Sequence, residues 1–197
     1  MARILPAVLT LAGLLAVPAT TWAFDPEAVY RERAVVLSVE GGYGWQFQAQ
    51  DPFTGLEFAN VGVRVGMLPF GIVGSGIVEG ALELGLEPIY QRYVTPVDAF
   101  YAGLAAVARY HFTALGRLVP YVELAGAAGG TDLRVSEQQS SFGFLLFGGA
   151  GLSYFVAERT ALYAGYRFQH VSNAYTSDPN IGINSNSAVV GLSYIFK

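Results

Sequence analysis

Residues 34–47 read AVVLSVEGGYGWQF, and this stretch decides the fold because its side chains alternate in character. The apolar positions are Leu37, Val39, Tyr43, Trp45 and Phe47, and the small or polar positions are Ser38, Glu40, Gly42, Gly44 and Gln46. Successive side chains of a β-strand point to opposite faces, so this period of two predicts a strand with one apolar face. The stretch is longer than the average strand of about 5–6 residues and meets the roughly 9–11 residues needed to cross a bilayer.

The same alternation recurs along the chain, interrupted by turn-like breaks such as Asp51-Pro52, Thr95-Pro96 and Ser177-Asp178-Pro179-Asn180. Eight segments result, at approximately 34–47, 56–69, 78–90, 99–112, 118–128, 141–155, 159–172 and 184–196. Barrels of the bacterial outer membrane have an even number of antiparallel strands, and eight is their smallest usual number.

The composition points to a wall that faces lipid. Hydrophobic residues make up 53% of the chain, yet Gly and Tyr interrupt them so often that no run after residue 23 resembles a membrane-spanning helix. A soluble domain would have few places for so many apolar side chains, whereas a closed barrel exposes them to lipid and satisfies every strand hydrogen bond. We therefore predict an all-β, eight-stranded antiparallel transmembrane β-barrel of the outer-membrane type.

The N-terminus has the pattern of an export signal. Arg3 precedes an apolar run from Ile4 to Val17, and small residues end at Ala23. This pattern predicts a signal peptide at residues 1–23 and a barrel at residues 24–197, located in the bacterial outer membrane. The chain has no cysteine, which excludes a disulfide scaffold, and its net charge of -4 argues against nucleic-acid binding.

Charged residues fall on the face opposite the apolar one. They are Glu40, Arg64, Glu83, Arg109, Glu123 and Arg167, and His111 shares their face. Side chains fill the interior of an eight-stranded barrel, and buried charges must be paired. We therefore interpret these residues as an internal ion-pair network with a structural role rather than as a catalytic centre. A crowded, charged interior also disfavours a pore.

Three polar residues break the apolar face near the C-terminus. His170 and Ser172 have the parity of the apolar side chains of their segment, and Asn184 has that of the next segment. With both chain ends in the periplasm, all three lie outside the barrel at its extracellular rim. A base beside a hydroxyl is what nucleophilic attack on an ester requires, and a third group holds the imidazole tautomer. The backbone amides of Asn173 and Ala174, or the Asn173 side chain, are candidates for the oxyanion hole.

The sequence here resembles the outer-membrane lipid A deacylases (PagL-type, also called acyloxyacyl hydrolases). The family motif His-x-Ser-Asn-Ala/Gly stands as His170-Val171-Ser172-Asn173-Ala174, and the following Asn-x-Gly as Asn180-Ile181-Gly182. The resemblance implies removal of the acyl chain at the 3-position of lipid A. It makes Ser172 the nucleophile and His170 the general base, and it implies no metal or organic cofactor. A homodimer in the membrane plane would fit some members of this family.

Two positions depart from the family pattern. The family has Glu as the third triad residue, whereas this chain has Asn184, which can orient a His but supplies no charge. Asp178 in the loop is a possible substitute acid. An aromatic residue usually ends such barrels as an assembly signal, whereas Phe196 is followed here by Lys197.

Two functions from different classes remain open from the sequence. The first is a lipid A ester hydrolase, carried by His170 and Ser172. The second is a non-enzymatic surface barrel with a structural or adhesin-like role, because a barrel fold alone implies no activity. Polar residues at a strand end also often do no more than meet the lipid headgroups. The pairing of His170 with Ser172 on the lipid-facing side favours the hydrolase.

Overall fold

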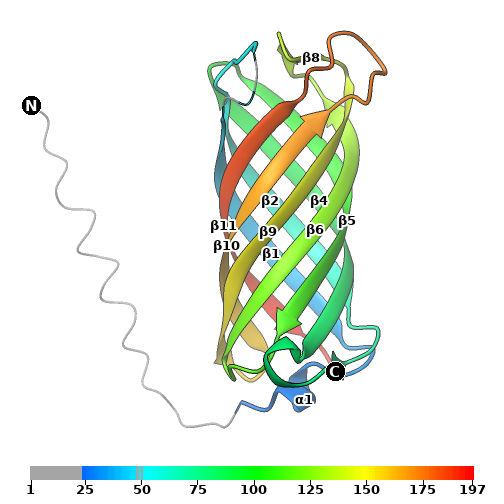
Figure 1. The fold of residues 1–197 in the computed structure, drawn as a ribbon, viewed down its shortest axis with the longest axis vertical. Helices are drawn as coiled ribbons and strands as arrows, with labels where there is room; N and C mark the ends of the chain where they lie inside the picture. Colours follow the sequence, from blue (N-terminus) through cyan, green and yellow to red (C-terminus); the bar gives the residue numbers. More distant parts are fainter. Residues whose placement is uncertain (1–23, 48, 50) are drawn as a thin grey trace, which may run out of the picture.

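A computed structural model describes residues 24–47, 49 and 51–197 of the chain. The predicted signal peptide, residues 1–23, lies outside the described residues. The described chain forms one tall barrel, with the helix α1 (Pro26–Val29) and the C-terminus at the same end (Figure 1). In this part of the chain, no helix is both long and apolar enough to span a membrane.

Eight long antiparallel strands form the barrel wall. They are β1 (Val35–Gln46), β2 (Glu57–Met67), β4 (Gly80–Thr95), β5 (Ala99–Phe112), β6 (Leu118–Thr131), β9 (Phe142–Ala157), β10 (Thr160–Ser172) and β11 (Ile183–Ile195). Each pairs with its neighbours along the chain, and the pairing of β1 with β11 closes the barrel. The predicted fold is confirmed. The short elements are β3 (Ile72–Val73), the 3-10 helix η2 (Gly76–Val78), β7 (Arg134–Val135) and β8 (Gln138–Gln139).

The alternation along each strand separates lumen from lipid as the sequence predicts. In β1, Ser38 and Glu40 are buried, whereas Leu37 and Val39 are exposed. The same period holds in the other long strands, and Leu124 reaches 68% exposure on the outer wall. A wall of exposed Leu, Val, Tyr and Phe is stable only against an apolar solvent, so this surface faces lipid.

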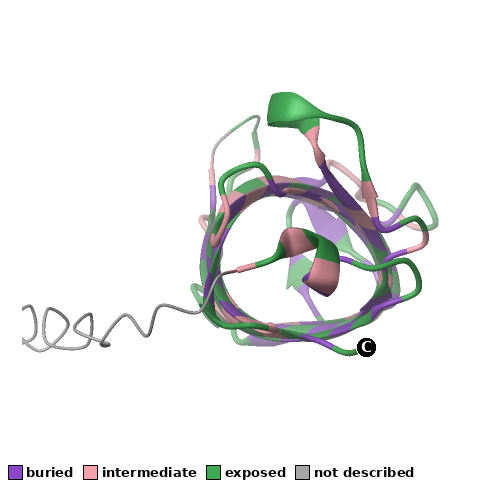
Figure 2. Ribbon diagram, turned by 90° about the horizontal axis from the view of Figure 1, so that it is seen from below, coloured by how far each residue is buried: buried purple, intermediate pink, exposed green. Residues whose placement is uncertain are grey.

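Apolar side chains close the lumen at both ends. At the end where the C-terminus lies, α1 lies across the opening (Figure 2), and Val29 and Tyr30 belong to an apolar cluster with Phe155. This short helix begins at Pro26, and the Asp25 side chain accepts a hydrogen bond from Ala28 N (3.2 Å), which is ordinary N-capping. At the opposite end, Leu133 and Val135 of the β6–β9 connection belong to a second apolar cluster inside the mouth.

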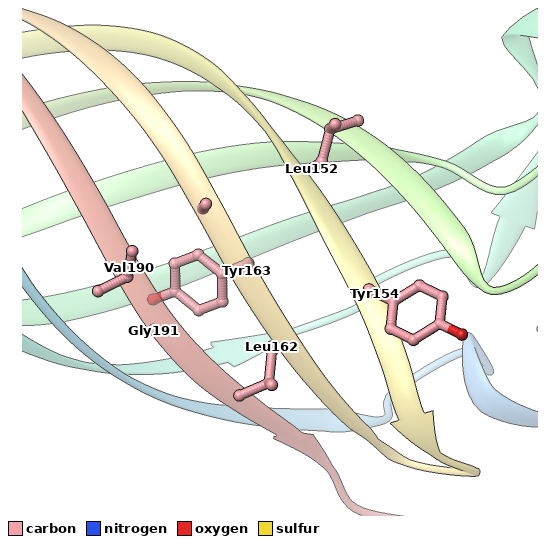
Figure 3. A pocket seen from close by; sticks show the side chains of 7 residues that line it. Leu152, Tyr154, Leu162, Tyr163, Val190 and Gly191 are labelled. Atoms are coloured by element: carbon pink, nitrogen blue, oxygen red, sulfur yellow. The ribbon is translucent and has the colours of Figure 1, made fainter. Parts of the chain in front are cut away.

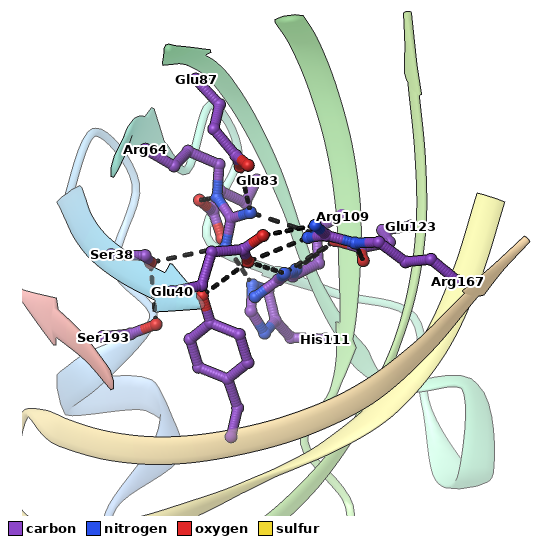
Figure 4. A network of polar contacts seen from close by, with 11 residues as sticks. Ser38, Glu40, Arg64, Glu83, Glu87, Arg109, His111, Glu123, Arg167 and Ser193 are labelled. Atoms are coloured by element: carbon purple, nitrogen blue, oxygen red, sulfur yellow. Dashed lines mark hydrogen bonds and ion pairs between the residues drawn. The ribbon is translucent and has the colours of Figure 1, made fainter. Parts of the chain in front are cut away.

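Between the two apolar ends lies a layer of buried ion pairs (Figure 4). Arg64 contacts Glu83 (2.9 Å) and Glu87 (3.0 Å), and Arg167 contacts Glu40 and Glu123. Arg109 contacts Glu123 (2.7 Å), and His111 Nε2 lies 2.9 Å from Glu83 Oε2. The predicted network therefore forms. It also includes a fourth acid, Glu87, and the Tyr163 hydroxyl, which donates to Glu40 (2.8 Å). Sequence parity placed Glu87 on this face, but the predicted set omitted it.

Candidate active site

The three predicted site residues lie on adjacent strands at the rim. His170 and Ser172 come from the end of β10, and Asn184 from the start of β11, where it pairs directly with His170 in the ladder. All three are half-buried. His170 and Ser172 alternate with the buried Gln169 and Val171, and Asn184 lies between the buried Ile183 and Ser185. They therefore project from the outer wall. The connecting loop, residues 173–182, lies at the end opposite α1 and the C-terminus (Figure 1).

One hydrogen bond fixes the state of the imidazole. His170 Nδ1 lies 2.8 Å from Asn184 Oδ1, and an amide oxygen can only accept, so Nδ1 carries the proton. The other ring nitrogen, Nε2, is then left with a lone pair, as a general base requires. Asn184 is itself held, because its carbonyl accepts a hydrogen bond from Phe47 N (3.1 Å).

Ser172 is on the same face as His170 but is not bonded to it. Ser172 ends β10, and within the described part of the chain its hydroxyl makes no hydrogen bond. Two residues along a strand separate the Cα atoms by roughly 6.5–7 Å. The strand thus brings the hydroxyl and the imidazole to one face, without a hydrogen bond between them.

The loop after Ser172 is held by Asn173, which is also a predicted oxyanion-hole residue. The backbone N–H of Asn173 donates to Asn180 Oδ1 (2.8 Å), and its side-chain amide donates to Ser177 O (2.9 Å) and Pro179 O (3.2 Å). In this structure these donors therefore bond within the loop. Ala174 follows in the left-handed region at φ 52° and is exposed.

Gly182 explains the spacing of the second motif. Its φ is +85°, and a Cβ built on it would lie 2.6 Å from His170 Cε1 and 3.1 Å from Nε2. Only glycine both adopts this conformation at little cost in conformational free energy and leaves room for the His170 ring. Asn180, two residues earlier, fastens the loop to Asn173. The loop and the imidazole are therefore packed as one unit.

Asp178 does not replace the missing acid. It lies exposed in the loop between β10 and β11, while His170 Nδ1 is already bonded to Asn184. Asn184 is thus the residue that orients the ring in this structure.

The wall around the site is apolar and shallowly hollowed. His170 pairs in the ladder with Leu146 of β9, which borders a hollow of about 620 Å³ that continues over Leu124 and Gly126. A second hollow, of about 550 Å³, lies farther along the wall, nearer to the β9–β10 turn than to the site, and is lined by residues that include Leu162 and Val190 (Figure 3). Both hollows open to the lipid side and suit hydrocarbon chains.

A closed antiparallel barrel with an apolar wall and a His, Ser and Asn group on that wall defines a class: outer-membrane barrels with a candidate hydrolase site facing lipid. The sequence profile of the lipid A 3-O-deacylase (PagL) family matches residues 74–193, which is more than half of the chain and includes the whole site. The chain belongs to this family. It is therefore a lipid A deacylase of the bacterial outer membrane, and a hydrolase.

Solved structures agree with the fold. The crystal structure of the outer membrane enzyme PagL has a TM-score of 0.60 at 22% identity and covers 79% of this chain and 97% of its own. Neisserial surface protein A has a TM-score of 0.58 at 18% identity and covers 84% and 100%. No curated protein sequence matches the chain.

Proposed function

We propose that the chain hydrolyses the ester that links the 3-position acyl chain to lipid A, with Ser172 as nucleophile, His170 as general base and Asn184 as the residue that orients the ring. The observation that carries this proposal is the His170–Asn184 hydrogen bond of 2.8 Å on the lipid-facing wall, beside an unbonded serine hydroxyl. A barrel with a purely structural role does not require a His–Asn hydrogen bond beside a serine on its lipid-facing wall.

The reaction proceeds in two steps, acylation of Ser172 and hydrolysis of the acyl-serine. In the first, Ser172 Oγ attacks the ester carbonyl while its proton passes to His170 Nε2, and the C–O bond to the sugar breaks as the sugar oxygen takes that proton. In the second, water attacks the acyl-serine, His170 takes the water proton, and Ser172 leaves with it as the free fatty acid departs. We assign the hydrogen bond that stabilises the oxyanion of the tetrahedral intermediate to the Ala174 backbone N–H, because the donors of Asn173 bond within the loop.

The position of the site suits a substrate that never leaves the membrane. We propose that ester groups of outer-leaflet lipids reach His170 and Ser172 at the rim. The exposed side chains of Leu146 on the neighbouring strand and of Phe168 on the same strand support this, because they provide apolar wall beside the site. A lipid A molecule diffusing in the leaflet would present its ester laterally, with its acyl chain along the hollows of the wall. Desolvation of the reacting groups by lipid strengthens their electrostatic interactions.

The residue that orients the His170 ring is neutral in this chain, because it is Asn184. In a serine protease, the change from acid to Asn costs about 10⁴ in turnover, because the wrong tautomer forms. Here the hydrogen bond gives the working tautomer, so the remaining loss is the charge that would stabilise the imidazolium. We expect measurable but slow turnover.

The test is mass spectrometry of lipid A from cells that produce the wild type, Ser172→Ala or Asn184→Ala. The wild type should remove one acyl chain, Ser172→Ala none, and Asn184→Ala less than the wild type. Identical, fully acylated lipid A from all three strains would instead favour the non-enzymatic barrel. Removal of the chain by Ser172→Ala would exclude Ser172 as the nucleophile.

A further inference from the structure

A carboxylate is buried in the turn between β7 and β8, at the mouth of the barrel. Glu137 is 0% exposed. Its Oε1 accepts hydrogen bonds from Gln46 Nε2 (2.9 Å) and Thr54 N (2.6 Å), and its Oε2 accepts from Thr54 Oγ1 and Ser136 Oγ. Burial raises the pKa of Glu137, but the hydrogen bonds from Thr54 and Gln46 outweigh burial and hold it below its ordinary value. The side chain thus fastens the turn to the β1–β2 loop.

The main chain of the same turn contacts the loop that carries the site. Glu137 O accepts a hydrogen bond from Ile181 N (2.9 Å), and Gln139 O accepts one from Ser177 Oγ (3.1 Å). Between these two bonds, Gln138 forms a β-bridge with Asn180. Three segments at this end of the barrel, residues 51–56, 132–141 and 173–182, therefore meet at the β7–β8 turn.

Both contacts lead directly to the reacting groups. Ile181 precedes Gly182, whose backbone lies against the His170 ring. Asn180 accepts the hydrogen bond of Asn173 N, and Asn173 directly follows Ser172. A shift of residues 180–182 would therefore move Gly182, which lies against the His170 ring. It would also move the backbone of Asn173, which directly follows Ser172.

We infer that Glu137 is a positioning residue for the deacylation reaction: its carboxylate fixes the turn on Thr54 and Gln46, and its carbonyl fixes Ile181 and, through Gly182, the His170 ring. This inference rests on the proposed function of His170 and Ser172. A carboxylate suits the position because both oxygens accept hydrogen bonds, whereas an amide would turn an NH2 group toward one set of donors.

The experiment measures kcat and KM of purified, refolded Glu137→Gln and Glu137→Ala on lipid A. A displacement of about 1 Å can lower a rate by about 10²-fold, so Glu137→Ala should lose about that factor in kcat. Glu137→Gln keeps one acceptor and should lose less. KM should stay near the wild-type value, because the apolar wall that holds the acyl chains is unchanged. The folded-barrel band on unheated SDS gels confirms that each variant is folded.

Glu57→Gln is the matched control. Glu57 is also a carboxylate near this end of the barrel, but its partner is the Tyr43 hydroxyl and not the site loop. It should keep the wild-type kcat. Folded Glu137 variants with wild-type kcat, or an equal loss in Glu57→Gln, would overturn the inference. An inactive wild type would instead overturn the proposed function, so the two failures are distinguishable.

Discussion

The lumen and the rim of this barrel use similar polar side chains in opposite ways. Within the lumen, Arg167 bonds to both Glu40 and Glu123, and Arg64 bonds to both Glu83 and Glu87. On the outer wall, His170 has one side-chain partner, and Ser172 has none among the described residues. The arginines of the lumen are paired with carboxylates, although buried atoms such as Glu87 Oε1 and His111 Nδ1 have no hydrogen-bond partner in the described chain. The proposed reacting groups of the rim lack any ion pair within that same part of the chain, so the pairing of charges distinguishes the lumen from the rim.

Placement reinforces this difference. Buried charges cost free energy unless they are paired, and the lumenal layer meets that condition. Polar side chains on a lipid-facing wall are also costly near the bilayer centre but much less so near the interface. His170, Ser172 and Asn184 lie at the end of their strands, where that cost is smallest.

The largest expected effect is on activity alone. Ser172→Ala should lower lipid A deacylation by at least about 10³-fold, because the nucleophile is removed. Its stability should stay within about 0.5 kcal/mol of the wild type, since Ser172 makes no hydrogen bond in the described chain. Urea unfolding followed by the gel shift of the folded band, beside the activity assay, checks both. A large loss of stability would remove the contrast between rim and lumen.

The converse effect is expected in the lumen. Arg167→Met leaves Glu40 without its close arginine partner and leaves Glu123 with Arg109 alone, and breaking a buried pair typically costs about 3–5 kcal/mol. The fraction that remains folded should keep its turnover per molecule, because Arg167 faces away from the site. The same urea titration and an active-site titration measure these two quantities. Loss of turnover in fully folded Arg167→Met would assign a catalytic role to the lumen.

An intermediate effect is expected where the loop meets the ring. Gly182→Ala places a Cβ 2.6 Å from His170 Cε1, so the ring must move. We expect a loss of roughly 10–100-fold in kcat from this displacement. The left-handed backbone should cost about 1–2 kcal/mol of stability. An Ala variant with normal kcat would show that the ring position at the rim is not tightly specified.

The smallest expected effect is a gain. Asn184→Glu replaces a neutral acceptor of the His170 proton with a charged one, and charge-assisted hydrogen bonds are about twice as strong as neutral ones. We expect kcat to rise by roughly a factor of ten. Steady-state kinetics of the wild type, Asn184→Glu and Asn184→Ala measures whether kcat rises or falls. The Ala variant should be slower than the wild type. A slower Glu variant would mean that the loop is adapted to an amide at this position.

Strand periodicity predicted the wall almost completely. Each predicted segment overlaps one long strand, and the strand ends agree closely at β1, β5 and β10. The third segment was too short, because β4 continues to Thr95 with its alternation intact, burying Gln91 and Tyr93. Gln91 bonds to Gln169 across the lumen (2.8 Å), a long-range contact that no local pattern indicates.

The site was predicted where it depends on parity and missed where it depends on loops. The side of the wall taken by His170, Ser172 and Asn184 follows from the period of two. The loop contacts of Asn173 and Glu137 were not predicted, because they come from hydrogen bonds made by irregular segments. A loop has no period, so its sequence gave no signal that Glu137 is buried.

The central claim is that ester chemistry occurs at Ser172 on the lipid side of the wall. In the most direct measurement, outer membranes that contain the protein are treated with an alkyl fluorophosphonate. An activated serine oxygen attacks its phosphorus, forms an O–P bond and releases fluoride. Peptide mass spectrometry then locates the adduct. The account predicts one adduct, on Ser172, formed much more slowly in His170→Ala. The claim is wrong if Ser172 stays unmodified in folded protein that was active before treatment. It is also wrong if the adduct lies on another residue.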